Sequence, residues 1–347
     1  MTKKLPDKIL IRPVISADVD DLLDMVERSS GGLSSLQPRH EFLLDYIQTS
    51  EKSFSGQYDL EDPHKYLLGM FVSGELIGCA AVKTQIGVGS PFINFDIIGD
   101  GLDQYLVASS RFTGATEVGS LFLHPDYRAY GLGKYLAKVR YLLMAAEPWR
   151  FGDTVIAELR GICGAEGSPL YDYLFKNKLE RTFLEADEEY FDRNPDKLGD
   201  IVPIGRIDVS GFPMPVRASL AQPHPSGAAA YRMLQKEGFI FSGTIDLFDA
   251  GPIVYAYRDT IRTIMNRKEG AILPVSSISG GQPYLISAGE VENFRAIVCP
   301  AQTGPTGLLI SELDYAALAL ESGESVFYWK NDASLRDTRK GPVKAQI

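Results

Sequence analysis

The residues best placed to do chemistry lie in the stretch 117–133, EVGSLFLHPDYRAYGLG, which is followed by an amphipathic run to Ala146. This pattern predicts a strand, a glycine-rich turn and a helix that begins directly on the turn. Gly131 and Gly133 have no Cβ atom, so the backbone there can approach a ligand closely and point unpaired N–H groups at it. Because the helix dipole and the free amides favour clustered negative charge, and Arg128 adds a cation, we expect a pyrophosphate to bind here.

The spacing Arg-x-x-Gly-x-Gly distinguishes this loop from two other phosphate-binding motifs. It is not the dinucleotide fingerprint, since only two glycines are present and the preceding strand lies deep in the chain. It is not the phosphate loop of nucleoside triphosphatases, since no Gly-Lys-Ser/Thr closes it. The pattern resembles the coenzyme A pyrophosphate loop of GNAT-type acyl-CoA N-acyltransferases. An ordinary helix start after a strand is the structural alternative.

The composition is that of a globular protein with an excess of negative charge. The chain has 347 residues, 45% of them hydrophobic, which suffices for two domains or for one large domain with an appendage. A formal net charge of −10 argues against nucleic acid or an anionic membrane as the main partner, since both are bound largely by positive charge. The three cysteines show neither metal-ligand spacing nor an even disulfide set, and no secretory or membrane-spanning segment stands out. We therefore predict a cytoplasmic protein.

The elements that must position the loop alternate between strand and helix patterns. Ser16 is the expected N-cap of the first helix, and Ser73-Gly74 predicts a hairpin turn. Strands are expected at 9–14, 66–86 (two strands), 92–98, 104–110, 116–124, 154–160 and 239–248, and helices at 19–26, 42–47, 133–146, from 169, and 226–237. The acidic block 185–192 is interpreted as a solvated face, with a guanidinium-attracting rim as the alternative.

This order predicts an α+β fold of the GNAT type, with a mixed, mainly antiparallel sheet and flanking helices. After residue 258 the pattern changes to short apolar runs separated by Gly, Pro and Asn, which predicts a small, barrel-like β-rich domain. We expect an acyltransferase domain at 1–258 with an insertion at about 87–113, the β-rich domain at 259–330, and a disordered tail at 331–347.

Along nearly its whole length the sequence resembles the bacterial arginine N-succinyltransferase family. The blocks that carry the resemblance occur in order at 31–36, 121–128, 144–146, 155–161, 224–225, 237–239, 246–252, 281–283 and 293–295. Such a series is far more specific than a glycine loop. The proline-rich run 211–216 has no counterpart in this pattern.

The resemblance implies an enzyme that transfers the succinyl group of succinyl-CoA to the α-amino group of L-arginine. Succinyl-CoA is then a co-substrate, with no permanently bound cofactor and no metal, and the paired subunits of some family members imply a homo- or hetero-oligomer. The family's catalytic histidine, a proton donor in a His-Pro pair, corresponds to His224. Its succinyl-CoA contact corresponds to Leu121.

Acyl transfer to an amine agrees with a catalytic histidine. The α-ammonium must lose a proton before it attacks a thioester, and the departing thiolate needs one, so an imidazole can serve either end. Of the four histidines, His40 and His64 lie in polar surroundings, and His124 competes because it also precedes a proline beside the loop. We predict His224 as general acid/base, with histidine closing a loop before a helix as the alternative.

The remaining site predictions concern coenzyme and substrate contacts. Leu121 and Leu123 are expected to bind the coenzyme with Arg128, Gly131 and Gly133, the strand acting through its backbone groups.

For the substrates, Arg160 is the candidate for the succinyl carboxylate, with an ion pair to Glu158 or a neighbour as the alternative. Glu158 and Ser34 are hypotheses for the acceptor. Ornithine or another amine as acceptor, and a non-catalytic acyl-CoA-binding regulatory subunit, are the competing functions.

Overall fold

A computed structural model of the chain describes residues 5–29, 35–55, 59, 61–89, 92–101, 103–164, 167–192, 201–320 and 324–330. The predicted tail at 331–347 and the predicted acceptor contact Ser34 lie outside these residues. The described residues form two compact units. The first unit draws on the described residues within 5–84, 118–151 and 259–330, and the second unit on those within 85–117 and 152–258.

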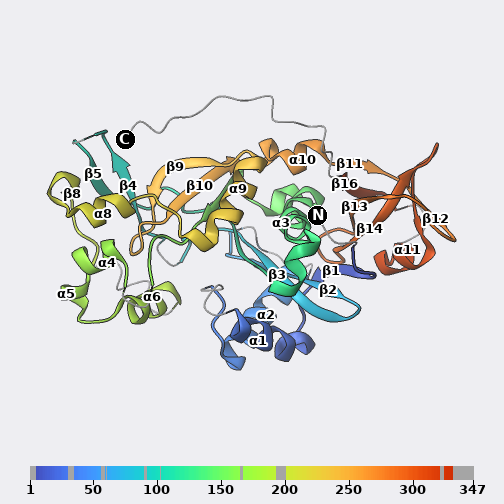
Figure 1. Ribbon diagram of the computed structural model, residues 1–347, viewed down its shortest axis with the longest axis horizontal. Helices are drawn as coiled ribbons and strands as arrows, with labels where there is room; N and C mark the ends of the chain where they lie inside the picture. Colours follow the sequence, from blue (N-terminus) through green and yellow to red (C-terminus); the bar gives the residue numbers. More distant parts are fainter. Residues whose placement is uncertain are drawn as a thin grey trace. The chain divides into compact units, whose positions relative to one another are not determined.

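The sheet of the first unit joins strands from both ends of the chain (Figure 1). Its strand order is β11-β16-β13-β14-β1-β2-β3-β6. The N-terminal strand β1 is antiparallel to both β14 and β2, so it connects the C-terminal strands to the central hairpin. The strands are β1 (Ile9–Pro13), β2 (Lys65–Val72), β3 (Glu75–Lys83), β6 (Thr116–Leu123), β11 (Lys268–Gly270), β13 (Gln282–Ala288), β14 (Arg295–Thr303) and β16 (Val326–Lys330).

Two helices, α1 (Val19–Arg28) and α2 (His40–Phe54), pack together beside β2 and β3 (Figure 1). Their apolar residues recur at helical spacing and are buried, as predicted: Leu22, Val26, Leu43 and Ile47. The predicted hairpin is also confirmed. Its turn has positive φ at Ser73 (52°) and Gly74 (94°), which suits the twist of the two strands.

The prediction that Ser16 caps the first helix is wrong. A 3-10 turn, η1 (Ser16–Asp18), precedes α1, and its N-cap is Ile15. The Ser16 hydroxyl donates instead to Glu51 of α2 at 2.6 Å. The Ser16 hydroxyl, which the local sequence predicts as the helix cap, is therefore hydrogen-bonded to a carboxylate of another helix.

The C-terminal part of the first unit is rich in β-structure, as predicted. β12 (Ile272–Val275) pairs parallel with β15 (Leu308–Ser311), which is antiparallel to β14. The helix α11 (Glu312–Leu318) shares a buried apolar cluster with these strands. Another helix, α10 (Arg262–Asn266), packs against α3 (Gly133–Ala146).

The second unit contains a sheet in the order β7-β10-β9-β4-β5-β8. β10 lies antiparallel to both β7 and β9, and the two strands predicted in the insertion, β4 and β5, form an antiparallel pair that extends this sheet. The strands are β4 (Asn94–Ile98), β5 (Tyr105–Ser109), β7 (Thr154–Glu158), β8 (Arg206–Asp208), β9 (Ile240–Ile245) and β10 (Pro252–Tyr257).

Short helices surround one apolar core of the second unit. They are α4 (Pro169–Leu174), α5 (Lys176–Leu179), α6 (Phe183–Asp192) and α8 (Met214–Ser219). A further helix of this unit is α9 (Ala228–Glu237). Phe95, Phe175 and Ile245 are among the buried residues of this core. Within the described residues, no helix combines the length and apolar character needed to cross a membrane.

Candidate active site

The glycine loop has the predicted strand, turn and helix geometry. After β6 the chain makes a 3-10 turn, η2 (Pro125–Tyr130), and then enters α3 at Gly133. Gly131 ends η2 in the left-handed region, with φ 69° and ψ 26°, so its glycine is required by the turn itself. The N–H groups of Leu132, Gly133 and Lys134 have no acceptor among the described residues, whereas the Tyr135 N–H donates to the Leu132 carbonyl. Three adjacent donors are therefore available to an anion.

Gly133 differs from Gly131 because the fold itself has room for a side chain there. A Cβ atom at Gly133 would meet only the Leu123 Cδ2 atom, at an ordinary distance of 3.8 Å. The exposed Arg128 is fixed beside this position, since its Nε donates to the Leu123 carbonyl at 3.1 Å. That bond leaves the terminal guanidinium nitrogens to supply charge at the mouth of the loop.

The strand before the loop has an unusual backbone at its centre. Ser120 has φ 46°, which is uncommon for a residue with a side chain and lies within β6 rather than in a turn. Its hydroxyl contacts Ser35 Oγ at 2.7 Å, and its carbonyl accepts from the Cys79 thiol at 3.3 Å. Leu121, the predicted succinyl-CoA contact, follows directly and is half-buried. Local strain of this kind is typical of strands that present backbone groups to a ligand.

A buried arginine supports the same part of β6. Arg140 of α3 is only 3% exposed, and its Nη1 donates to the Gly119 carbonyl at 3.3 Å. The hydrophobic spacing of α3 assigned this position no role. The one feature of the sequence that could have indicated a role for Arg140 is its charge within an otherwise apolar helix face.

The parallel ladder between β6 and β7 is short. It pairs Thr116 with Val155 and Glu117 with Ile156, and no described residue after Glu117 belongs to it. The polar backbone groups that follow Glu117 are therefore not used by this ladder.

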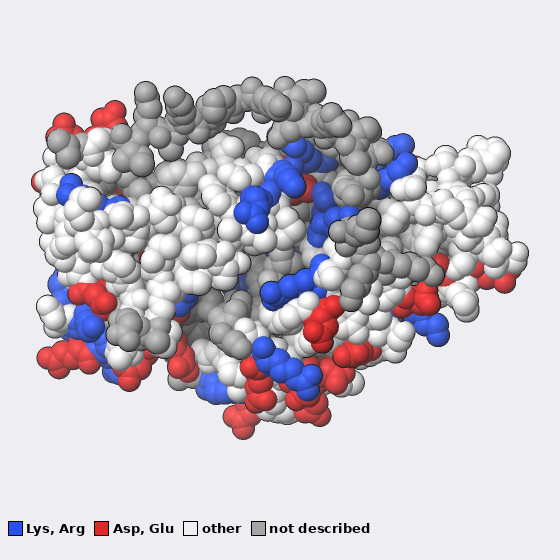
Figure 2. All heavy atoms as spheres, in the orientation of Figure 1, with Lys and Arg blue, Asp and Glu red and all other residues white. Residues whose placement is uncertain are grey.

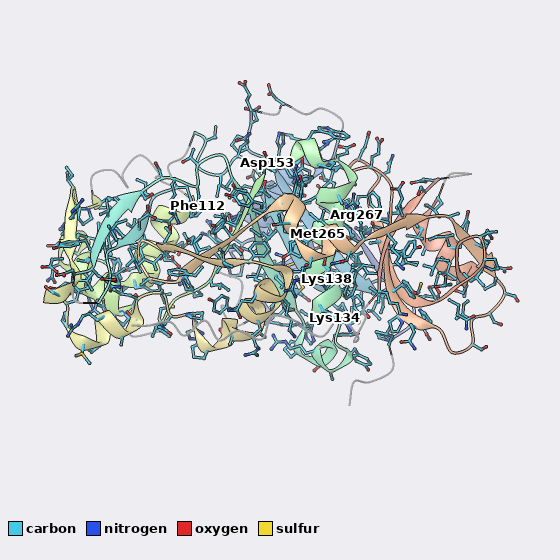
Figure 3. All side chains as sticks on the ribbon, turned by 90° about the horizontal axis from the view of Figure 1, so that it is seen from above. Phe112, Lys134, Lys138, Asp153, Met265 and Arg267 are labelled. Carbon is cyan, nitrogen blue, oxygen red and sulfur yellow. The ribbon has the colours of Figure 1, made fainter. Side chains whose placement is uncertain are left out.

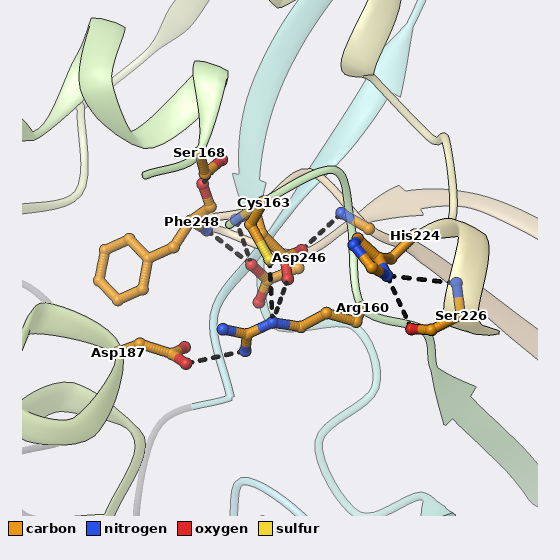
Figure 4. A network of polar contacts seen from close by, with 10 residues as sticks. Arg160, Cys163, Ser168, Asp187, His224, Ser226, Asp246 and Phe248 are labelled. Atoms are coloured by element: carbon orange, nitrogen blue, oxygen red, sulfur yellow. Dashed lines mark hydrogen bonds and ion pairs between the residues drawn. The ribbon is translucent and has the colours of Figure 1, made fainter. Parts of the chain in front are cut away.

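His224 lies in the second unit, directly after a bridge between Gly161 and Pro223. Its N–H donates to the Arg160 carbonyl at 2.7 Å, which ties it to the chain just beyond β7. Its Nδ1 accepts the Ser226 N–H at 3.2 Å and contacts the Ser226 hydroxyl at 2.7 Å (Figure 4). A backbone N–H can only donate, so Nδ1 keeps its lone pair, and the proton of the neutral ring lies on Nε2.

The sequence predicts a helix over 226–237, with Ser226 at its start, and the structure corrects this start. The residues Pro225–Gly227 form a 3-10 turn whose N-cap is His224, and α9 begins at Ala228. The serine hydroxyl bonds to the imidazole instead, because the turn folds it back onto the ring.

His124 has the same local arrangement in the first unit. It caps η2, and its Nδ1 accepts the Asp126 N–H at 3.4 Å. Both histidines therefore stabilise a turn that begins with proline. The capping role is common to both, so it does not by itself distinguish the catalytic candidate.

Arg160 lies at the centre of a polar cluster that the sequence did not reveal (Figure 4). Its Nη1 is 2.7 Å from Asp187 Oδ2, and its Nε is 3.3 Å from Asp249 Oδ2 and from Cys163 Sγ. The alternative is an ion pair with Glu158 or a neighbour, and the carboxylates that pair with Arg160 are those of Asp187 and Asp249. That Arg160 binds the succinyl carboxylate stays a prediction.

Burial decides the electrostatics of this cluster. It raises the pKa of Asp187, and Arg160 opposes the shift. Burial, followed by the charge of Asp246, raises the pKa of Asp249 well above its ordinary value of 3.8. For Arg160, burial lowers the pKa, but Asp187 and Asp249 outweigh it and the net shift is upward, so the guanidinium stays charged.

Two glycines allow the backbones that carry this cluster to approach. A Cβ on Gly161 would lie 2.0 Å from the Asp249 carbonyl oxygen, and a Cβ on Gly251 would lie 1.9 Å from the Leu159 oxygen. No side chain fits at either position. The close approach holds Arg160 and Asp249 together, and with them the carbonyl that binds His224.

The sequence predicts a solvated face at the acidic block 185–192. Glu185 is exposed, as expected, but Asp187 turns inward to a guanidinium. That guanidinium belongs to Arg160 of the same chain. Glu158 is half-buried at the end of β7.

The glycine loop, the strand before it and the helix that follows define an acyltransferase of the GNAT type. Residues 9–263 match the family described as Arginine N-succinyltransferase beta subunit, and residues 271–330 match its C-terminal domain. The chain therefore belongs to the arginine N-succinyltransferase family, which confirms the predicted family and the predicted fold class.

Relatives of known name cover nearly the whole chain. Arginine N-succinyltransferase subunit beta of Pseudomonas aeruginosa is 29% identical over 92% of this chain and 97% of that protein. The subunit alpha of the same organism is 28% identical over 92% and 98%. The solved structure of arginine/ornithine succinyltransferase subunit AI from Pseudomonas aeruginosa superposes with a TM-score of 0.79, at 27% identity, over 93% of this chain and 98% of that one.

Proposed function

We propose that the chain transfers the succinyl group of succinyl-CoA to the α-amino group of L-arginine, which gives N2-succinylarginine and free coenzyme A. The observation that carries the proposal is the family match over both 9–263 and 271–330. The free amides of the glycine loop and the imidazole of His224 are groups of the two kinds that such a reaction needs, an anion-binding site and an acid/base.

The donor is held mainly by backbone groups. The pyrophosphate of coenzyme A accepts hydrogen bonds from the N–H groups of Leu132, Gly133 and Lys134, and Arg128 adds positive charge. The pantetheine amides pair with backbone groups of β6 near Leu121, as an added strand would. The positive φ of Ser120 supports this assignment, because it turns the strand out of regular geometry directly before Leu121.

In the chemical step, the neutral α-amine attacks the thioester carbonyl and a C–N bond forms. The tetrahedral intermediate then collapses, the C–S bond breaks, and the sulfur leaves as a thiolate that needs a proton. His224 can donate this proton in its imidazolium form: Nε2 passes its proton to the sulfur while the Nδ1–H bonds to the Ser226 hydroxyl, and the ring then recovers a proton from the nitrogen that becomes the amide. The ammonium proton of the substrate is lost before attack.

The contacts to the rest of the substrates stay predictions. These are Arg160 for the succinyl carboxylate, and Glu158 and Ser34 for the acceptor. Arg160 has a second function that its bonds support more directly: it positions His224 through its carbonyl and is itself held by Asp187.

The reaction also implies where and in what form the protein works. Succinyl-CoA is a metabolite of the cell interior, so we place the chain in the cytoplasm. Relatives are named as subunits alpha and beta, and we propose that this chain also assembles into an oligomer. The mass of the protein in solution tests this.

The test of the function is the release of free thiol from succinyl-CoA with and without L-arginine. Arginine-dependent release supports the proposal. Release only with ornithine or another amine assigns a different acceptor, and binding of succinyl-CoA without release under any acceptor assigns a regulatory subunit.

The proton-donor role is tested with a matched pair of variants, His224→Asn and His124→Asn. Asparagine is a good N-cap, so each variant keeps its turn and loses only the imidazole. We expect His224→Asn to lower kcat by about 10²-fold with little change in coenzyme A binding, since loss of a general acid costs this much. His124→Asn should keep wild-type turnover. Equal effects of the two substitutions, or full activity of His224→Asn, would contradict the role.

A further inference from the structure

Two lysines of α3, Lys134 and Lys138, lie one helical turn apart just beyond the glycine loop. Figure 3 shows them in one row with Met265 and Arg267, which come from α10 and the residue after it. Figure 2 shows Lys and Arg side chains gathered on the face that carries α3 and α10. In a chain whose formal net charge is −10, this concentration of cations requires an explanation.

Without a ligand, the lysine pair works against the stability of its own helix. Like charges four residues apart repel each other. Burial, and then the charge of Lys138, lowers the pKa of Lys134. Lys134 and Arg267 form no ion pair with a carboxylate among the described residues. An anion bound between the two ammonium groups would reduce their repulsion.

Lys138 is held in place by the C-terminal part of the chain. Its Nζ donates to the Thr263 hydroxyl at 2.9 Å and lies 4.2 Å from the centre of the Trp329 ring. Thr263 is fully buried, and the indole of Trp329 packs edge-on against Tyr135. The ammonium is thus oriented in advance, and little side-chain entropy is lost when a ligand binds.

We propose that Lys134 and Lys138 bind the 3′-phosphate of coenzyme A, and that the C-terminal segment carrying Thr263 and Trp329 contributes to donor binding by orienting Lys138. This rests on the proposed function, in which the pyrophosphate lies on the amides of residues 132–134. It gives the β-rich C-terminal part of the chain a role in substrate selection.

The spacing along the helix favours this phosphate over the pyrophosphate. Lys138 follows Gly133 by five residues, which places its backbone about 7 Å further along the helix axis. One ribose separates the 3′-phosphate of coenzyme A from its 5′-diphosphate, a comparable span. A dianionic phosphate also matches two ammonium groups in charge.

The experiment compares succinyl-CoA with succinyl-3′-dephospho-CoA as donors. The variants are Lys138→Met and Lys134→Met, in which the apolar stem remains and the charge is removed. Lys52→Met is the matched control, because Lys52 is an exposed lysine on α2 of the same unit. Thermal unfolding of each variant checks the fold.

We expect each test substitution to raise KM for succinyl-CoA by about tenfold, since one charge-assisted contact is lost. KM for the dephospho donor should stay within about twofold of wild type, and Lys52→Met should change neither value. Trp329→Leu, which removes the ring beside the ammonium, should give a smaller effect of the same selectivity.

Equal effects on both donors, or no effect on either, would overturn the inference. Calorimetric binding of coenzyme A and 3′-dephospho-CoA separates it from the proposed function. If the protein turns over no succinyl donor but binds coenzyme A more tightly than the dephospho form through these lysines, the reaction is wrong and the subsite is right. If arginine-dependent turnover occurs without preference for the 3′-phosphate, the proposed reaction is right and the proposed phosphate subsite is wrong.

Discussion

Alanine substitutions at Gly131 and Gly133 should separate the folding role of the loop from its binding role. At Gly131 the backbone has φ 69°, so a Cβ atom strains the turn. The cost of the left-handed region for a residue with a side chain is about 1–2 kcal/mol. We therefore expect Gly131→Ala to lower the free energy of unfolding by that amount.

Gly133→Ala should have the opposite effect on stability. Gly133 is the first residue of α3, and a Cβ there has only one neighbour, Leu123 Cδ2 at 3.8 Å. Replacing glycine at a compatible helical position stabilises a protein by about 0.4–1 kcal/mol, because the unfolded chain loses freedom. The fold itself therefore does not require glycine here.

We expect glycine at position 133 to be required for coenzyme A binding instead. A methyl group on Gly133 stands beside the N–H groups that we assign to the pyrophosphate, and losing one hydrogen bond to a charged group costs about 1.5–3 kcal/mol. This corresponds to a weakening of coenzyme A binding by about tenfold or more. Urea unfolding measures the first quantity, and calorimetric titration with coenzyme A measures the second.

Two results would refute this reasoning. If Gly133→Ala binds coenzyme A as tightly as wild type, the pyrophosphate does not lie on these amides. If it destabilises the protein as much as Gly131→Ala, its glycine is structural. The result that supports the reasoning is a stable protein with weak coenzyme binding.

Two further predictions concern the cluster that positions His224. Gly251→Ala should lower the free energy of unfolding by about 3 kcal/mol or more, because its Cβ would lie 1.9 Å from the Leu159 oxygen. The control Gly211→Ala, whose Cβ would have nothing within 4 Å, should leave stability in urea unfolding unchanged. Similar stabilities for the two variants would contradict the close approach of the backbones. The folded-state pKa of Asp187 lies above its ordinary value of 3.8, so folding takes up a proton between the two values and the stability contributed by this group falls as pH rises from about 4 through the folded-state pKa. Asp187→Asn should flatten that slope in urea unfolding series at several pH values, and an unchanged or reversed slope would show that another group causes it.

Much of the local structure follows from the sequence because it depends on local causes. The hairpin at Ser73-Gly74 needs two residues with positive φ, and the glycine loop needs Gly131 for the same reason. The amphipathic spacing of α1 and α2 agrees with their buried faces. The ordered blocks also indicated the family, which the match over 9–263 confirms.

Contacts between distant segments could not be predicted in this way. Ser16 binds Glu51 rather than capping its own helix, and Ser226 bonds to an imidazole for a similar reason. In each case the sequence contains the competing groups but does not state which of them meet.

The candidate site shows the same division. The sequence by itself determined which residue types were present for chemistry: a glycine loop for an anion, a His-Pro pair, and an arginine after a buried strand. Only the tertiary structure decided that Arg160 is held by Asp187 and Asp249, and that Nδ1 of His224 is an acceptor and its proton lies on Nε2. The physical reason is that ion pairs and tautomers depend on distances of a few ångströms between segments far apart in the chain, and residue order alone does not fix those distances.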